Sequence, residues 1–200
     1  MPSKDVKDYA TRTFRRNKIE LEKWNRKLAL YETTHPDLYK QFKAYTTDKD
    51  FDVVKLFKPE FVKATQSTRE ANEYILTELS SKMPRFVGGT ADVSSSTRAI
   101  IENGGDFSKH NMRGKNIHFG VREHAMGAIC NGLCLYLKSP VFCSAFLAFS
   151  NYMLSPIRMA AIMNLPVWYM FSHDSYKVGE DGPSHQPIEQ LGQLRLMPNV

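Results

Sequence analysis

The loop HDSYKVGEDGPSHQP, residues 173–187, is the part of the chain richest in side chains that could do chemistry. It contains two histidines and three acids: His173, His185, Asp174, Glu180 and Asp181. Histidine is suited to proton transfer because its ordinary pKa is near neutral. The two histidines are 12 residues apart on an irregular loop, a spacing that matches no zinc pattern. The loop therefore favours proton transfer over a metal site, with ordinary loop structure as the alternative, and we assign no metal ligand.

A second feature is the carboxylate of Glu123, in the stretch NIHFGVREHAMGAICNGL. It stands where the extended run IHFGV turns into the almost uncharged run AMGAICNGLCLYL, and its only polar neighbours are Arg122 and His124. A carboxylate led into an apolar region must be paired, hydrogen-bonded or protonated. We therefore expect a specific partner for Glu123.

Phosphate recognition has no familiar loop here, since the chain contains neither Gly-x-Gly-x-x-Gly nor a Walker-type sequence. Arg69 is a candidate because it falls in the first turn of a helix expected to begin at Ser67. Helix amides and a guanidinium could bind one anion together. A surface arginine would give the same pattern.

The elements that position these residues alternate between helix and strand. The expected elements are helix 67–81, strand 85–89 with a glycine turn, strand 116–120, helix 122–137, strand 140–146, helix 148–164 and strand 165–172. Strands about 25 residues apart with helices between them indicate an α/β fold, a parallel sheet with helices on both faces. In such sheets ligands bind beyond the carboxyl ends of the strands, where the candidate residues lie.

The first 65 residues have a different character, and we predict a helical linker arm over 1–65 followed by a domain over 66–200. Leu21, Trp24, Leu28 and Tyr31 have helical spacing within 17–31, and a second helix is expected from about Pro36. Residues 46–65 are mixed in composition and are interpreted as a hinge.

Composition excludes several classes of protein. The chain of 200 residues is 42% hydrophobic and 24% charged, as in soluble globular proteins. It has no 18-residue uncharged apolar segment and no apolar N-terminal signal, so we expect no membrane span and no secretion. Three cysteines, Cys130, Cys134 and Cys143, lie in apolar runs and suggest buried thiols in a reducing, cytoplasmic setting.

The net charge of +6 is concentrated in the arm, since residues 1–65 contain 15 basic and 10 acidic residues. A basic arm can attract nucleic acid. The basic residues alternate with acids and no nucleic-acid motif accompanies them, so we favour a solvated helical surface and expect no nucleic-acid partner.

Four motifs carry a family resemblance. GGTADVSSS, HFGVREHAMGAICNG, FLAFSNY and HDSYKVGEDGPSHQP, in this order and at these separations, closely resemble transketolases. The similarity covers residues 66–200, the pyrimidine-binding domain of that thiamine diphosphate family, and EKWNRKLALYETTHPDLYKQF looks like the preceding linker. The resemblance implies transfer of a two-carbon ketol unit from a ketose phosphate to an aldose phosphate in the pentose phosphate pathway. It also implies sugar-phosphate substrates and a homodimer.

The resemblance also implies roles for ten residues. Glu123 matches the glutamate that bonds to a ring nitrogen of the aminopyrimidine and favours its imino tautomer, which gives it the partner expected above. The other cofactor-binding matches are Asp92, Phe146, Phe149 and Tyr152. His173 and His185 match histidines that hold and protonate substrate oxygens. Asp181 matches the aspartate that recognises the stereochemistry of a substrate hydroxyl group. Arg69 and Ser96 match residues that contact the substrate phosphate.

The chain lacks one motif of the full family pattern. The GDG motif that holds Mg²⁺ and the diphosphate is absent, and in this family it belongs to a separate domain. The sequence therefore resembles a fragment that supplies half of a site, which we expect to be inactive alone. Two alternatives stay open: another thiamine diphosphate enzyme (dihydroxyacetone synthase, 1-deoxyxylulose-5-phosphate synthase or phosphoketolase), or a non-catalytic module for dimer assembly.

Overall fold

The structure is a computed structural model that describes residues 1–46, 53–61 and 65–200. It divides into two compact units, Met1–Thr47 and Asp48–Val200, which are described separately. The hinge expected over 46–65 lies partly outside the described residues, which include 46, 53–61 and 65 of this segment, and the domain boundary at residue 65 remains a prediction. No helix in the described ranges is both long enough and apolar enough to cross a membrane.

The first unit is a pair of helices, α1 (Lys4–Thr34) and α2 (Pro36–Thr46). The helical arm is thus confirmed, and α1 begins earlier than expected because the Ser3 hydroxyl accepts a hydrogen bond from the Val6 amide and caps it. The Trp24 and Phe42 rings meet edge to face with centroids 6.4 Å apart. This contact joins the two helices.

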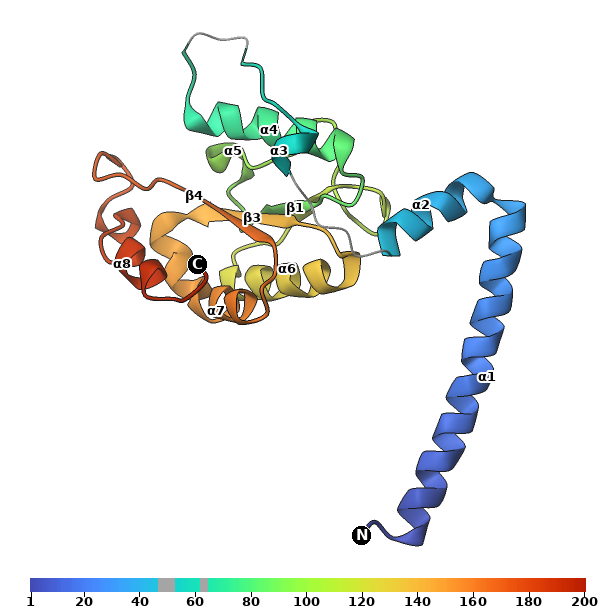
Figure 1. Cartoon of the computed structure of the whole chain (residues 1–200). Helices are drawn as coiled ribbons and strands as arrows, with labels where there is room; N and C mark the ends of the chain where they lie inside the picture. The colour runs from blue at the N-terminus through green and yellow to red at the C-terminus, as the bar shows by residue number, and fades with distance from the viewer. Residues whose placement is uncertain (47–52, 62–64) are drawn as a thin grey trace. The chain divides into compact units, whose positions relative to one another are not determined.

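The second unit is an α/β fold (Figure 1). Its elements in chain order are α3 (Val53–Leu56), α4 (Thr68–Lys82), β1 (Gly88–Thr90), α5 (Ser94–Thr97), β2 (Asn116–His118), α6 (Glu123–Leu137), β3 (Val141–Phe146), the 3₁₀ helix η1 (Leu147–Met153), α7 (Leu154–Ile162), β4 (Val167–Ser172), the 3₁₀ turn η2 (Pro183–His185) and α8 (Gln190–Arg195). The four strands form one sheet in the order β2-β1-β3-β4, and every pairing is parallel. The predicted parallel α/β fold is confirmed.

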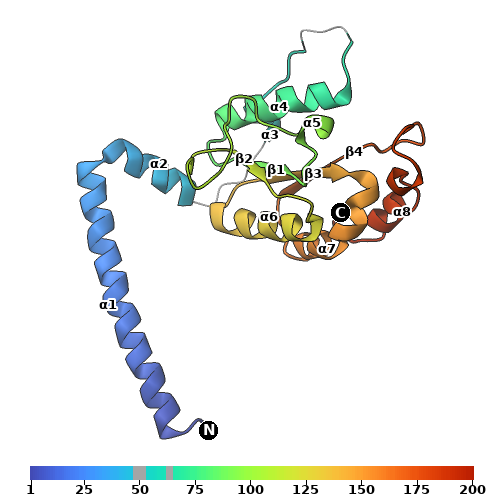
Figure 2. The same cartoon turned by 180° about the vertical axis from the view of Figure 1, so that it is seen from behind.

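Helices cover both faces of this sheet, with α4 on one side and α6 and α7 on the other (Figures 1 and 2). The side chains of β3 alternate accordingly. Phe142 is fully buried with Leu76 and Leu79 of α4, whereas Val141 and Cys143 join the core under α6 and α7. All three cysteines are buried, as predicted.

Two sequence-based expectations need correction, both for backbone reasons. The glycines of RFVGG were expected to form a turn, but Gly88 and Gly89 lie within β1. A β-carbon on Gly89 would lie 1.8 Å from the Ile117 carbonyl oxygen, so glycine is required where β1 and β2 pair. The helix expected over 148–164 is split into η1 and α7, which places Pro156 in the first turn of α7, where its missing N–H breaks no helical hydrogen bond.

Candidate functional site

The candidate residues gather at one edge of the sheet because the strands are parallel. Asp92 follows β1, Glu123 follows β2, Phe146 ends β3 and His173 follows β4. Strand register aligns the last two, since Phe146 pairs with Ser172. The carboxyl edge predicted from sequence therefore collects residues from all four strands.

Five rings form an aromatic cluster at this edge: Phe146, Phe149, Tyr152, His173 and His185. The Phe146 and His173 rings are stacked with centroids 3.7 Å apart, and Phe149 meets His185 edge-on at 4.9 Å. Phe146, Phe149 and Tyr152 follow one another at 6.1 Å, and Phe146 also lies 5.9 Å from His185. The three aromatics and both histidines predicted from sequence are thus brought together.

His173 is held by its backbone and by polar neighbours. Its φ of +52° is left-handed, uncommon for a residue with a side chain. Nδ1 lies 2.9 Å from the Ser172 hydroxyl, and Nε2 lies 4.0 Å from Oδ2 of Asp181. Burial is the main influence on its pKa and lowers it, partly opposed by the carboxylate of Asp181. The neutral form of the ring is therefore favoured.

His185 ends the turn η2, which follows Gly182 at φ +76°. Its Nδ1 lies 2.8 Å from the hydroxyl of the preceding residue, Ser184. The positive φ makes glycine the favoured residue at position 182. The GEDGPSH sequence therefore forms a turn that brings the second histidine back to the aromatic cluster.

Glu123 is the first residue of α6 and is only 8% exposed. Within the described residues its carboxylate makes no hydrogen bond and no ion pair. The helix N-terminus favours a negative charge, but the helix has no side-chain cap. The Arg122 guanidinium instead lies over Gly120, within about 3.1 Å of where a β-carbon would be. Glu123 is a buried carboxylate without a partner in the described part of the chain.

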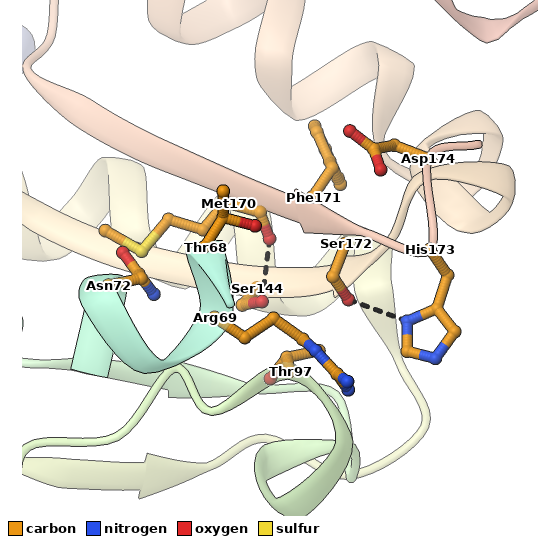
Figure 3. A pocket seen from close by; sticks show the side chains of 10 residues that line it. All are labelled: Thr68, Arg69, Asn72, Thr97, Ser144, Met170, Phe171, Ser172, His173 and Asp174. Carbon is orange, nitrogen blue, oxygen red and sulfur yellow. Dashed lines mark hydrogen bonds between the residues drawn. The ribbon is translucent and has the colours of Figure 1, made fainter. Parts of the chain in front are cut away.

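Arg69 borders a cavity of about 420 Å³ between α4 and the ends of β3 and β4 (Figure 3). Its lining residues are Thr68, Arg69, Asn72, Thr97, Ser144, Met170, Phe171, Ser172, His173 and Asp174. The first turn of α4 is fixed by the predicted capping box, in which Ser67 and Glu70 cap each other's amides. The Arg69 guanidinium donates to the Ser96 carbonyl oxygen, so these two predicted residues do meet.

Arg69 and Ser96 contact each other, and two further predicted residues stand apart from both that pair and the aromatic cluster. Asp92 is exposed in a left-handed conformation, φ +65°, directly after β1. Within the described residues no hydrogen bond, ion pair or ring contact joins Asp92 or Glu123 to the aromatic cluster. Sequence reasoning missed Ser172 and Ser184, although each directly precedes a candidate histidine.

Comparison with known proteins decides the family. The model of the transketolase pyrimidine-binding domain matches residues 64–200. The chain belongs to the transketolase family. It is 40% identical to the transketolase of Bacillus subtilis over 204 residues, which covers all of this chain and 30% of that protein. It is 36% identical to the chloroplastic transketolase of Spinacia oleracea, covering all of this chain and 27% of that protein.

Solved transketolases have the same fold. The Leishmania mexicana enzyme superimposes with a TM-score of 0.87 at 36% identity, covering all of this chain and 30% of that one. The Pichia stipitis transketolase in complex with sedoheptulose 7-phosphate gives 0.87 at 30% identity, with the same coverage. The chain therefore spans about 30% of the length of the transketolases it matches.

Proposed function

We propose that this chain supplies the aminopyrimidine-binding half of a transketolase site, for thiamine diphosphate-dependent transfer of a two-carbon ketol unit between sugar phosphates. The observation that carries the proposal is the environment of the Glu123 carboxylate. The residue is 8% exposed, and its carboxylate makes no hydrogen bond or ion pair within the described residues, so both oxygens are available to a ligand. Glu123 lies at the same sheet edge as two histidines and three aromatic rings, which suits a planar, nitrogen-containing ring.

The residues present fit the aminopyrimidine. The Glu123 carboxyl group would hydrogen-bond a ring nitrogen and share a proton with it, while Phe146, Phe149 and Tyr152 would pack around the ring. Asp92 would border the same pocket. When bound, thiamine diphosphate supplies the electron sink that ketol transfer needs. The contribution of this chain is to orient the ring and to hold a proton at a defined atom.

The sugar phosphate would lie across the histidines. His173 and His185 would hydrogen-bond and protonate substrate oxygens, and Asp181 would select the configuration of a hydroxyl group. Arg69, with Ser96 beside it, would bind the phosphate from the first turn of α4, where helix amides also favour an anion. The depressed pKa of His173, caused chiefly by burial, supports a neutral ring that holds a substrate oxygen through its one N–H, and protonation of that oxygen would need the protonated ring.

The remaining parts of the site would come from outside these 200 residues. Mg²⁺ and the diphosphate need a binding motif that this chain does not contain, and the complete site would form in a homodimer of a longer protein. Cytoplasmic pentose phosphate metabolism is the setting that this activity implies.

The test is a chimera in which this chain replaces the matching segment of the Bacillus subtilis transketolase. The chimera should transfer ketol units from xylulose 5-phosphate. Glu123→Gln should lower kcat by about 100-fold or more, the usual contribution of a positioned proton-transfer group. Glu102→Gln, which changes an exposed acid of the same unit, should stay within about twofold.

Three results would separate the alternatives. A folded, dimeric chimera that binds the cofactor but shows no turnover would support an assembly module. Preference for formaldehyde or pyruvate would indicate another thiamine diphosphate enzyme. Retention of full activity by Glu123→Gln would sink the assigned role of the carboxylate.

A further inference from the structure

Each histidine of the candidate site follows a serine, and each serine hydroxyl contacts the next imidazole. The Oγ–Nδ1 distance is 2.9 Å from Ser172 to His173 and 2.8 Å from Ser184 to His185. The two backbones differ, since His173 follows β4 with φ +52° and His185 ends the 3₁₀ turn η2. The same contact on two unlike backbones points to a shared role.

The surroundings of His173 decide which ring nitrogen carries the proton. Nε2 lies 4.0 Å from the carboxylate of Asp181, and an ionised carboxylate only accepts hydrogen bonds. At 4.0 Å the two groups are not hydrogen-bonded, but the negative charge attracts a proton on Nε2, and Nδ1 is then the acceptor for the Ser172 hydroxyl. The ring also stacks on Phe146 at 3.7 Å, which limits its rotation.

At His185 the serine acts without a carboxylate. Within the described residues, no group other than Ser184 hydrogen-bonds a nitrogen of this ring. The Ser184 hydroxyl can donate to Nδ1, and in that arrangement the proton of the neutral ring lies on Nε2. The edge-on contact with Phe149 at 4.9 Å restricts the ring as well. Both histidines can then present a neutral N–H donor at the same sheet edge.

We propose that Ser172 and Ser184 are positioning residues that hold His173 and His185 with the proton on Nε2, so that both rings donate to oxygens of the sugar phosphate. The assignment of a sugar phosphate as the substrate rests on the proposed function, whereas the histidine tautomers are a property of the folded chain. A hydroxyl suits this role because it can donate to the neutral ring and accept from the protonated one. The ring orientation is thereby kept in both charge states.

Long-range ¹H–¹⁵N NMR of the 200-residue chain tests the tautomers directly, because an unprotonated ring nitrogen resonates far from a protonated one. At about pH 8, where an ordinary histidine is neutral, both rings should show an unprotonated Nδ1. Ser172→Ala should raise the Nδ1–H fraction of His173 only, and Ser184→Ala that of His185 only. The expected change in tautomer ratio is roughly 3- to 10-fold, the equivalent of one ordinary hydrogen bond.

Matched variants separate positioning from a general structural effect. Ser172→Thr and Ser184→Thr keep the hydroxyl and should restore the wild-type spectrum. Ser175→Ala removes a hydroxyl that accepts from the Lys177 amide in the same loop, and it should leave both histidine spectra unchanged. A proton on Nδ1 in the wild type, or alanine variants with unchanged ratios, would overturn the proposal.

The chimera then tests the link to substrate. Ser172→Ala should lower kcat/KM about 3- to 10-fold and Ser172→Thr should restore it, if the tautomer governs donation to the substrate. A shifted tautomer with unchanged kcat/KM would overturn the substrate half of the proposal. A chimera whose wild-type form lacks transketolase activity would instead count against the proposed function and leave the NMR result standing.

Discussion

At the scale of single residues, the site combines groups that ordinary folding would disfavour. Glu123 is buried without a described partner, and His173 and Asp92 have positive φ values. Such conformations cost on the order of 1–3 kcal/mol each and persist only where the surrounding structure fixes them. Asp92 directly follows β1 and His173 directly follows β4, so both stand with Glu123 at the carboxyl edge of the sheet, the place where parallel sheets bind ligands.

The lowered pKa of His173 predicts a pH dependence of stability. Burial, the largest cause, and the positive charges of Arg69 and His185 lower the pKa, while Asp181 and Asp174 raise it. The folded state thus binds this proton less readily than the unfolded state does, whose histidine has a pKa near 6.5. The stabilising contribution is complete above about pH 6.5 and is lost as the pH falls through the folded pKa.

Urea unfolding at pH 7.5 and pH 5 of the wild type and of His173→Gln measures this effect. The wild type should lose more stability on acidification than the variant, because glutamine does not titrate. His110→Gln, on an exposed loop, is the control and should resemble the wild type. An equal loss in wild type and His173→Gln would contradict the prediction.

At the scale of elements, α6 connects the site to the core. Its first residue is Glu123, and Met126, Cys130 and Cys134 are buried along its inner face. The helix packs on α7 at Gly127, where an added β-carbon would lie 2.9 Å from Pro156. The position of the carboxylate thus depends on a close contact between two helices.

Two glycines of α6 give a paired prediction. Gly127→Ala should destabilise the chain by about 1–3 kcal/mol, because the new methyl group overpacks against Pro156. Gly132→Ala should stabilise it by about 0.5–1 kcal/mol, since no atom lies within 4 Å and alanine favours the helix. Urea denaturation of both variants measures the difference. Similar effects of the two substitutions would show that the helix contact is not tight.

Much of the fold could be predicted because its signals are local. Apolar runs predicted β3 and β4, and the Ser67 capping box predicted the start of α4. The spacing of about 25 residues between strands predicted a parallel sheet. Gly89 was misread because its requirement, the close approach of Ile117, comes from a strand distant in sequence. Ser144 was overlooked for the same reason, since only the sheet brings its hydroxyl to the Met170 carbonyl and to the cavity.

The site residues were found through motifs, and their geometry was not. No spacing rule foretells that Phe146 stacks on His173, because that contact depends on the register of β3 with β4. The sequence shows that a serine precedes each histidine, but it does not show that their side chains meet. The direction of those side chains depends on the positive φ of His173 and on the turn η2.

At the scale of the whole molecule, the proposed function makes the chain one side of a larger site. It spans about 30% of the length of related transketolases. The aromatic cluster is partly open, with Tyr152 63% exposed. An aromatic side chain this exposed is consistent with a surface that another part of a longer protein would complete.

We therefore predict that the 200-residue chain alone has no transketolase activity and negligible affinity for thiamine diphosphate. Isothermal titration calorimetry with thiamine diphosphate and Mg²⁺ should give no binding heat for the chain and a clear isotherm for the chimera. Ketol transfer by the isolated chain, measured with purified protein, would disprove this prediction.

The alternation of β3 side chains between the two cores also limits which length changes the protein can tolerate. An insertion or deletion of one residue inside β3 would exchange Phe142 with its neighbours between the α4 face and the opposite face. It would also turn Phe146 away from His173. We therefore expect insertions and deletions only in the segments between strands. In the loop after β4 we expect them only between His173 and His185.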